Sequence, residues 1–187
     1  MAQILTEEVP PESVMACDAG ENRLFMLHDF VVGEGGTLIQ PNGGGGMGYA
    51  IPAAMAAALA GDRPAYAVCG DGGFAMTMHG LMSAVENQLR MTVVVLNNRA
   101  LGWVYHGSGN KPFASTFADF DLAAIAAAIG CAASTVTNED ELRKALSEAA
   151  GYPGTSVIVA RTSLEDSYLD VMSSLSGRHA ESIDDNH

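Results

Sequence analysis

Positively charged side chains are scarce in this sequence. Its 187 residues include 9 Lys and Arg against 22 Asp and Glu, which gives a formal net charge of −13. Nucleic acids and anionic membranes attract cationic surfaces, so this balance argues against both as partners. With so few Lys and Arg side chains, a phosphate-bearing ligand would be held mainly by backbone N–H groups or through a metal ion.

Cysteine is also rare, and long apolar runs are missing. Cys17, Cys69 and Cys131 are odd in number and form no C-x-x-C pair, which argues against a disulfide framework or a zinc site and predicts buried thiols. The longest apolar stretch, 50–60, falls far short of the ~20 residues that span a bilayer. The N-terminus lacks a basic segment followed by an apolar core, so we expect no targeting segment and a cytoplasmic location.

Glycine and small apolar residues take the place of aromatic ones. The chain has 21 Gly, 48% hydrophobic residues and 6% aromatic residues, which is the profile of a globular domain. Short apolar runs alternate with helical patterns: strands are expected at 13–17, 37–40, 65–69, 92–96, 132–136 and 155–161, and helices at 21–30, 47–60, 74–88, 119–129 and 138–150. This order predicts a doubly wound α/β domain, a mostly parallel sheet with helices on both faces. We expect one domain over 1–175 and a polar tail over 176–187.

Glycine-rich and Asx-rich turns follow the expected strands. Asp71 follows the strand 65–69, within Gly70-Asp71-Gly72-Gly73, and Asn98 follows the strand 92–96, 27 residues after Asp71. Ligands of doubly wound sheets bind at the carboxyl ends of the strands. Glycines let a ligand approach the backbone closely, and Asp and Asn oxygens suit Mg²⁺. Two such turns one crossover apart predict a Mg²⁺–diphosphate site, in which the metal neutralises the phosphates.

These motifs resemble the diphosphate-binding domain of thiamine-diphosphate-dependent enzymes. Gly70-Asp71-Gly72, a 24-residue spacer and Asn97-Asn98 are similar to the diphosphate motif of that family. The segment 45–54 looks like the Gly-x-Met-Gly-x-x-x-Pro-Ala-Ala of the acetolactate synthase and benzoylformate decarboxylase group. Asp18-x-Gly20 and the segment 101–104 also have counterparts there.

The resemblance implies a role for each matching position. Asp71, the side chain of Asn98 and the backbone carbonyl of Ala100 would hold Mg²⁺. Met47 would support the bent cofactor, and the carbonyl of Gly45 would accept a hydrogen bond from its aminopyrimidine. The full set of cofactor-binding residues implied by the resemblance is Asp18, Gly20, Gly45, Gly46, Met47, Gly70, Asp71, Gly72, Gly73, Asn98, Leu101 and Gly102.

The resemblance also implies a reaction class and a partner. Enzymes of this family cleave or form a carbon–carbon bond next to a carbonyl, and a glutamate from a separate pyrimidine-binding domain protonates the aminopyrimidine. Too few residues precede the glycine loop here to form that domain. We therefore expect a hetero-oligomer, active only with a second subunit that supplies the glutamate, as in sulfopyruvate decarboxylase-like enzymes. The substrate would be a small 2-oxo acid or a 2-hydroxyacyl compound.

The substrate pocket is less well defined by the resemblance. Gly80 is commonly Glu in relatives, Glu21-Asn22 replaces a Gln-His pair of acetolactate synthases, and the segment after Val104 varies widely. No catalytic residue is therefore assigned within the chain. The candidate pocket residues, each with a structural role as its alternative, are His79, Trp103, Tyr105 and His106.

Two other functions are alternatives at this point. Gly43-x-Gly45-x-x-Gly48 matches the dinucleotide fingerprint after a short strand, which would indicate an NAD(P)-dependent oxidoreductase. That interpretation leaves Asn97-Asn98 without a role. The other alternative is a non-catalytic regulatory subunit of the same fold, which loss of Asp71 or Asn98 would favour, yet both are present.

Overall fold

The protein is described from a computed structural model that places residues 1–61, 63–165, 167–170 and 172–173. The expected polar tail, 176–187, lies outside the described residues. The elements in chain order are α1 (Ala2–Glu8), β1 (Val14–Cys17), α2 (Glu21–Asp29), β2 (Thr37–Ile39), α3 (Ala50–Ala60), β3 (Ala65–Gly70), α4 (Asp71–Thr77), α5 (Gly80–Glu86), β4 (Met91–Asn97), α6 (Gly102–Gly107), α7 (Leu122–Ile129), β5 (Ala132–Val136), α8 (Glu139–Gly151) and β6 (Thr155–Arg161).

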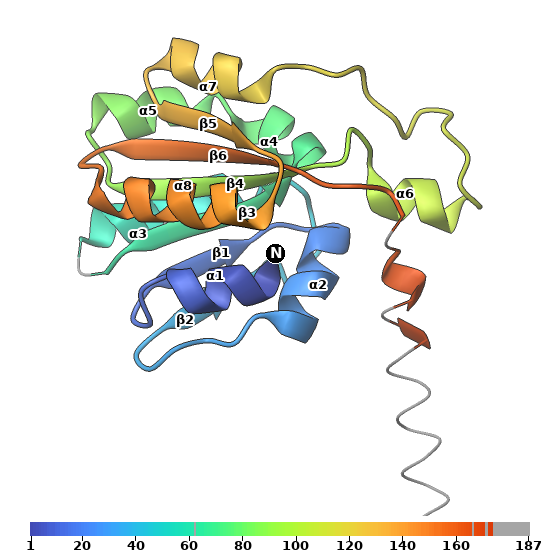
Figure 1. The fold of residues 1–187 in the computed structure, drawn as a ribbon, viewed down its shortest axis with the longest axis horizontal. Coiled ribbons are helices and arrows are strands. Elements are labelled where there is room, and N and C mark those ends of the chain that lie inside the picture. The colour runs from blue at the N-terminus through green and yellow to red at the C-terminus, as the bar shows by residue number, and fades with distance from the viewer. Residues whose placement is uncertain (62, 166, 171, 174–187) are drawn as a thin grey trace, which may run out of the picture.

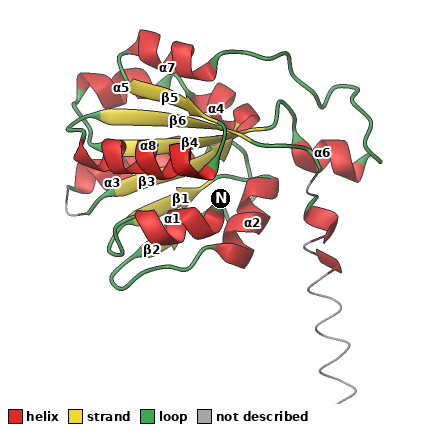
Figure 2. Ribbon diagram, in the orientation of Figure 1, coloured by secondary structure: helices red, strands yellow, loops and turns green. Residues whose placement is uncertain are grey.

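The strands of the described residues form one parallel sheet in the order β2-β1-β3-β4-β6-β5 (Figures 1 and 2). The chain leaves β1 outward to β2 and then returns past β1 to β3, so the winding direction reverses between β1 and β3. The predicted doubly wound α/β fold is confirmed. A reversal of this kind opens a crevice at the carboxyl ends of the strands, which is where such folds bind ligands.

Helices cover both faces of the sheet and enclose two hydrophobic cores. Residues of α3, α4, α5 and α7 form the core on one face, and residues of α1, α2 and α8 form the core on the other. Strand β4 serves both, because successive side chains point to opposite faces: Val93 and Val95 belong to the first core and Val94 to the second. This double burial explains why the strands read as uninterrupted apolar runs.

Side-chain caps fix where two of the predicted helices begin. Asn138 caps α8 by accepting a hydrogen bond from the N–H of Glu141 at 2.9 Å. The carboxylate of Glu141 accepts from the N–H of Thr137 at 2.7 Å, one residue before the cap. The helix predicted from 119 begins at Leu122, because the carboxylate of Asp121 accepts from the N–H of Ala124 and caps α7 there.

The observed helices differ from the predicted ones in three regions. The single helix expected over 74–88 is two, α4 and α5, and Gly80 opens the second where a Cβ would lie 3.3 Å from the sulfur of Met55 in α3. Helices α1 and α6 were not predicted. Both are short, and α1 is held by burial of Ile4 and Leu5 rather than by intrinsic helix propensity.

The three cysteines are buried free thiols, as predicted. Burial raises the pKa of Cys17 to about 12 and that of Cys131 to about 11, so neither thiol forms a reactive thiolate at neutral pH. Within the described ranges, no helix combines the length and the apolar character that crossing a membrane would require.

Candidate functional site

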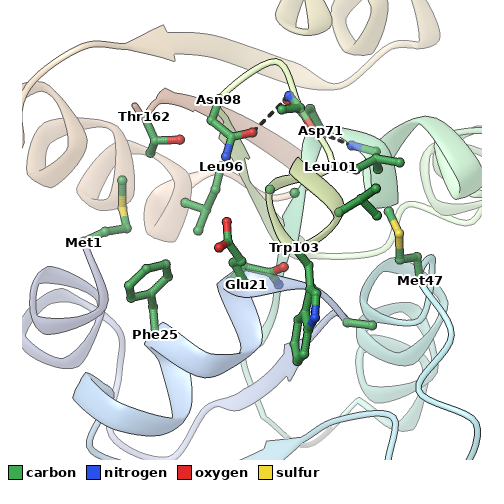
Figure 3. A pocket seen from close by; sticks show the side chains of 18 of the residues that line it. Met1, Glu21, Phe25, Met47, Asp71, Leu96, Asn98, Leu101, Trp103 and Thr162 are labelled. Atoms are coloured by element: carbon green, nitrogen blue, oxygen red, sulfur yellow. Dashed lines mark hydrogen bonds between the residues drawn. The ribbon is translucent and has the colours of Figure 1, made fainter. Parts of the chain in front are cut away.

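A cleft with a volume of about 290 Å³ opens at the carboxyl edge of the sheet, where the winding direction reverses (Figure 3). Its walls come from four strand ends that are far apart in the sequence, one of them the end of β6, which contributes Thr162 and Ser163. The lining residues after β1 include Gly20 and Glu21, those around the end of β3 are Gly70, Asp71 and Gly72, and those from the end of β4 into α6 include Asn98, Ala100, Leu101, Gly102 and Trp103. The edge predicted from the sequence to bind a ligand is therefore hollow.

Asp71 is the first residue of α4 and lies at the wall of this cleft. One carboxylate oxygen, Oδ1, accepts from the N–H of Gly72 at 2.7 Å, and the other, Oδ2, accepts from the N–H of Ala100 at 3.2 Å. Burial raises the pKa of Asp71, and hydrogen bonds from backbone N–H groups, Gly72 first among them, lower it only in part. A cation beside this carboxylate would compensate the burial of its charge.

A turn at the end of β4 positions Asn98. The side chain of Asn97 accepts from the N–H of Arg99 at 3.2 Å, and the side chain of Asn98 accepts from the N–H of Ala100 at 3.1 Å. Arg99 takes a left-handed conformation, with φ 59°, which turns the chain back toward α4. Asn98 and Asp71 therefore reach the same N–H group, that of Ala100, and the structure brings together the predicted diphosphate motif.

The residues at this point fit a magnesium ion by their chemistry. Among the described residues, no group of three or more His, Cys, Asp and Glu side chains is arranged to hold a metal. The predicted set differs from such a group, because it combines one carboxylate (Asp71), one amide oxygen (Asn98) and one backbone carbonyl (Ala100). Hard oxygen donors of this kind, completed by phosphate oxygens and water, are typical of Mg²⁺ sites.

Gly72 provides a close approach for two apolar side chains of the cleft. A Cβ at this position would lie 2.7 Å from a methyl carbon of Leu101 and 2.9 Å from the terminal carbon of Met47. Both side chains line the cleft (Figure 3). The absence of a side chain at Gly72 therefore lets Leu101 and Met47 pack against the first turn of α4.

Asp18 has a different environment from the one expected for a ligand-binding residue. Its buried carboxylate accepts from the N–H groups of Ala19 at 2.9 Å, Gly48 at 3.0 Å and Tyr49 at 2.9 Å. It does not line the cleft, and neither does Gly73, where a Cβ would overlap the Asp18 carboxylate. Asp18 holds the loop before α3 against the end of β1, which gives it a supporting place behind the site.

The glycine loop 43–46 lies apart from the cleft walls. A Cβ at any of its four positions would meet no atom within 4 Å, and none of the four residues, Gly45 and Gly46 included, lines the cleft. Met47 does. The loop also leads from the edge strand β2, not from a strand beside the reversal, which weakens the dinucleotide interpretation of Gly43-x-Gly45-x-x-Gly48.

The four candidate pocket residues occupy different places. Trp103 lines the cleft and stacks on Tyr168, with ring centroids 4.9 Å apart. Tyr105 is half-buried in α6 and does not line the cleft. His79 is exposed between α4 and α5, also away from the cleft. His106 is buried, with both ring nitrogens engaged.

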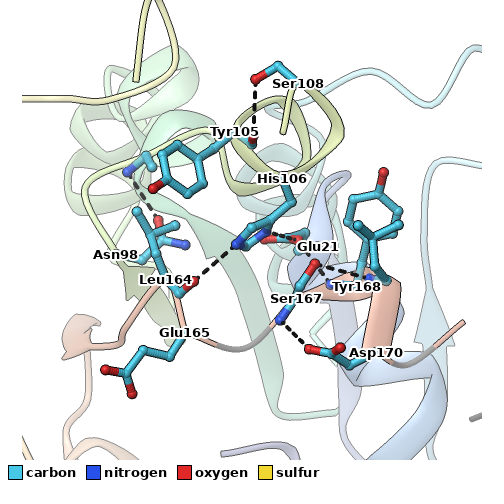
Figure 4. A network of polar contacts seen from close by, with 12 residues as sticks. Glu21, Asn98, Tyr105, His106, Ser108, Leu164, Glu165, Ser167, Tyr168 and Asp170 are labelled. Atoms are coloured by element: carbon cyan, nitrogen blue, oxygen red, sulfur yellow. Dashed lines mark hydrogen bonds and ion pairs between the residues drawn. The ribbon is translucent and has the colours of Figure 1, made fainter. Parts of the chain in front are cut away.

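His106 forms a buried ion pair that sequence reasoning did not find (Figure 4). Its Nδ1 lies 2.6 Å from Oε1 of Glu21, and its Nε2 lies 3.0 Å from the carbonyl oxygen of Leu164. A neutral imidazole carries only one N–H, so both contacts are hydrogen bonds only when the ring is protonated. Burial acts to lower the pKa of His106, but the hydrogen bonds and the charge of Glu21 raise it above its ordinary value. The two residues are 85 positions apart, which no local pattern reports.

A comparison with known protein families shows which family this chain belongs to. Residues 18–160 match the family described as "Thiamine pyrophosphate enzyme, C-terminal TPP binding domain". The chain belongs to this family. Thiamine pyrophosphate is another name for thiamine diphosphate, so the predicted cofactor class is confirmed, and the family assignment favours it over a dinucleotide.

Relatives of known name agree with the assignment. The chain is 36% identical over 149 residues to the protein YdaP of Bacillus subtilis, covering 78% of this chain and 26% of that protein. It is 29% identical to the large subunit of acetolactate synthase isozyme 1 of Escherichia coli, covering 84% and 29%. The crystal structure of benzoylformate decarboxylase from Polynucleobacter necessarius superimposes with a TM-score of 0.77 at 28% identity, covering 88% and 32%. The chain therefore spans between a quarter and a third of the length of these relatives.

Proposed function

We propose that this chain is the thiamine-diphosphate- and Mg²⁺-binding subunit of a heteromeric enzyme that cleaves or forms a carbon–carbon bond next to a carbonyl. The observation that carries the proposal is the convergence of Asp71 and Asn98 on the N–H of Ala100, at the edge of a cleft in a domain of this family. The reaction would be 2-oxo acid decarboxylation, acyloin-type ligation or cleavage of a 2-hydroxyacyl compound.

The charge of the cleft supports a metal-mediated diphosphate site. Among the described residues that line the cleft, none is Lys or Arg, while Glu21, Asp29 and Asp71 bring carboxylates. A diphosphate placed here would meet negative charge without a cationic side chain to compensate it. Mg²⁺ held by Asp71, Asn98 and the Ala100 carbonyl would offset much of the negative charge of the carboxylate and the phosphates.

The remaining cleft residues would position the cofactor. Met47 and Leu101 both pack over Gly72 and would support its body, while Gly70 leaves room for close approach to the backbone. Thiamine diphosphate, when bound, supplies a thiazolium carbon that adds to a carbonyl and withdraws electrons from the bond that breaks or forms. This chain would contribute orientation and a site shielded from bulk water.

The proposed partner is a pyrimidine-binding domain on a second subunit. The family is described as a C-terminal cofactor-binding domain, and the relatives are three to four times longer than their matched part. The glutamate that protonates the aminopyrimidine would come from that domain. No residue of this chain is assigned the role.

The cofactor can be tested by thermal unfolding of the chain with different ligands. Thiamine diphosphate with Mg²⁺ at one hundred times the dissociation constant should stabilise the fold by about 2.7 kcal/mol, and excess chelator should remove most of that gain. NAD and NADP should have no effect. Stabilisation by a nicotinamide dinucleotide, with none by thiamine diphosphate, would establish the oxidoreductase alternative instead.

Partner dependence can be tested by turnover. The homogeneous chain with thiamine diphosphate and Mg²⁺ should not convert pyruvate or benzoylformate, and activity should appear on adding a pyrimidine-binding subunit from a neighbouring reading frame. Robust turnover by the chain alone would overturn the split site. Cofactor binding without turnover in any reconstituted complex would support the non-catalytic alternative.

A further inference from the structure

A second cavity opens at the edge of the sheet opposite the cleft. Its volume is about 270 Å³, and its walls come from the starts of β3 and β4 and from the ends of α3 and α8 (Figure 1). The strands of the described sheet are parallel, so this is the edge at which they begin, whereas the cleft lies where they end. No described residue lines both cavities. The second cavity is therefore separate from the candidate cofactor site.

Two arginines line this cavity, although Lys and Arg are scarce in the chain and none of the described ones lines the cleft. Arg63 comes before β3, and its Nη1 donates to the carbonyl of Gly35 at 2.7 Å and to Oγ1 of Thr37 at 3.0 Å. Arg90 comes before β4, and its Nη2 donates to the carbonyl of Ala150. The other guanidinium nitrogens of both residues donate to no described residue. Each arginine is therefore held by one nitrogen and keeps N–H groups for a ligand.

Two buried hydroxyl groups in the cavity also lack a partner. Tyr66 and Thr92 line it, each is 4% exposed, and neither hydroxyl forms a hydrogen bond with a described residue. Register pairs Tyr66 of β3 with Thr92 of β4, so their side chains are neighbours on one face of the sheet. Within the described ranges, the unpartnered hydroxyls that are sealed from solvent are those of Ser13 and Ser156, so those of Tyr66 and Thr92 keep access to the cavity. Buried hydroxyls are normally hydrogen-bonded, so a ligand here would supply the missing partner.

The charges around the cavity favour an anion. Of the described residues that line it, none is Asp or Glu. The ends of α3 and α8 bring partial negative charge, about half an elementary charge each, against the two full positive charges of the arginines. Burial raises the pKa of Tyr66, Arg90 lowers it in part and Glu12 raises it, so the hydroxyl stays protonated at neutral pH and can donate. The cavity thus presents hydrogen-bond donors with an excess of positive charge.

We propose that this cavity binds a small organic anion, whose carboxylate or phosphate group is held by the two guanidinium groups and the two hydroxyls. Guanidinium groups match the geometry of both kinds of anion. The rest of the lining is mostly small and apolar and would contact a short carbon chain: Pro10, Ala58, Pro64, Ala65 and Met91. The site goes beyond the proposed function and does not depend on it.

The test is an NMR titration of the full ¹⁵N-labelled chain, which reports both the affinity and the place of binding. All described walls of the cavity belong to this chain, so the test needs no partner subunit. The probes are butyrate, n-butyl phosphate and the neutral butanamide. At least one anion should bind about tenfold or more tightly than butanamide, since several donors meet a charged group. The largest shift changes should fall at the amides of Ala65, Thr92 and Ala150, and the tighter anion identifies the head group.

Three substitutions separate a binding role from a structural one. Tyr66→Phe and Thr92→Val each remove a hydroxyl, and Arg90→Gln removes a charge. Each should weaken anion binding about fivefold or more and leave butanamide unchanged. Because neither hydroxyl has a partner within the described chain, Tyr66→Phe and Thr92→Val should not lower the free energy of unfolding in urea without ligand. The matched control is Arg143→Gln, an exposed arginine of α8 paired with Glu7 and Glu8, which should keep the wild-type affinity.

Several results would overturn the site: a preference for both anions over butanamide below about fivefold, shift changes centred on the cleft, or anion affinities of Tyr66→Phe and Arg90→Gln both within about twofold of wild type. Should Arg90→Gln not fold, because the end of α8 loses a donor, Arg63→Gln replaces it with the same expectation. Asp62→Asn, at a position outside the described residues, removes the carboxylate that precedes Arg63 in the sequence. It should leave anion binding equal or tighter, and weaker binding would contradict the proposal.

Discussion

Asp71 and Asn98 accept from the same backbone N–H, that of Ala100, at 3.2 and 3.1 Å. The two side chains come from the ends of adjacent parallel strands, β3 and β4, whose register pairs Gly70 with Leu96. One N–H group therefore orients two oxygen-bearing side chains toward a common point. The arrangement is made by backbone geometry, so it forms with the fold.

Gly73 should be important for stability, because the Asp18 carboxylate occupies the space that a side chain at this position would need. A Cβ at this position would overlap the buried Asp18 carboxylate, so Gly73→Ala should lower the free energy of unfolding by about 1–3 kcal/mol, as overpacking does. Gly151→Ala is the matched control, since a Cβ there at the end of α8 meets no atom within 4 Å. Urea denaturation followed by circular dichroism measures both, and equal effects of the two substitutions would contradict the close packing.

Asp18 should contribute to stability far more than an ordinary capping residue. Asp18→Ala leaves three backbone N–H groups, two of them from Gly48 and Tyr49, without their acceptor, so we expect a loss of about 3 kcal/mol or more. Asp121→Ala, which removes the exposed cap of α7, should cost about 1 kcal/mol. The same denaturation experiment compares them. A loss from Asp18→Ala no larger than from Asp121→Ala would show that the buried carboxylate does not anchor the loop.

The pair of His106 and Glu21 should make stability depend on pH. Interaction with Glu21 raises the pKa of His106 in the folded protein above its ordinary value of 6.5. A group with a raised folded pKa contributes fully below its unfolded pKa, and its contribution is lost as the pH rises through the folded pKa. The stability difference between wild type and His106→Asn should therefore be largest below pH 6.5 and shrink toward alkaline pH.

The measurement is a set of urea unfolding curves at several pH values. His79→Asn serves as the control for a histidine substitution, because His79 is exposed and forms no ion pair with the residues that the structure describes. A stability difference for His106→Asn that grows as the pH rises would contradict an ion pair between a protonated His106 and Glu21.

Most of the fold could be predicted from the sequence because the central strands β1, β3 and β4 are buried on both faces and consist mainly of apolar residues. Each expected strand lies within a residue or two of its observed bounds, from β1 to β6. Helix boundaries were less predictable from the sequence where packing against other elements determines them. The expected helix 74–88 is interrupted at Met78 and His79, between α4 and α5, and the apolar periodicity that runs through both helices does not report this break.

The candidate site was predictable to the extent that its residues follow strands directly. Asp71 and Asn98 both do, and the structure places them at one point. Glu21 and His106 escaped prediction as a pair, because 85 residues separate them and α6 was expected to be a loop. The sequence offers one signal for this pair. Glu21 is a carboxylate shortly after the strand 13–17, at a position where acetolactate synthases have a Gln.

The account is tested most directly by titrating thiamine diphosphate into the chain by calorimetry, with Mg²⁺ present and after chelation. The wild type and Asp140→Asn, an exposed carboxylate of α8, should bind with similar affinity when Mg²⁺ is present and lose most of it with chelator. Asp71→Asn and Asn98→Ala should each weaken Mg²⁺-dependent binding on the order of 100-fold, because each removes an oxygen donor or its charge. Binding that ignores chelator, or that survives both substitutions unchanged, would contradict a magnesium–diphosphate site at Asp71 and Asn98.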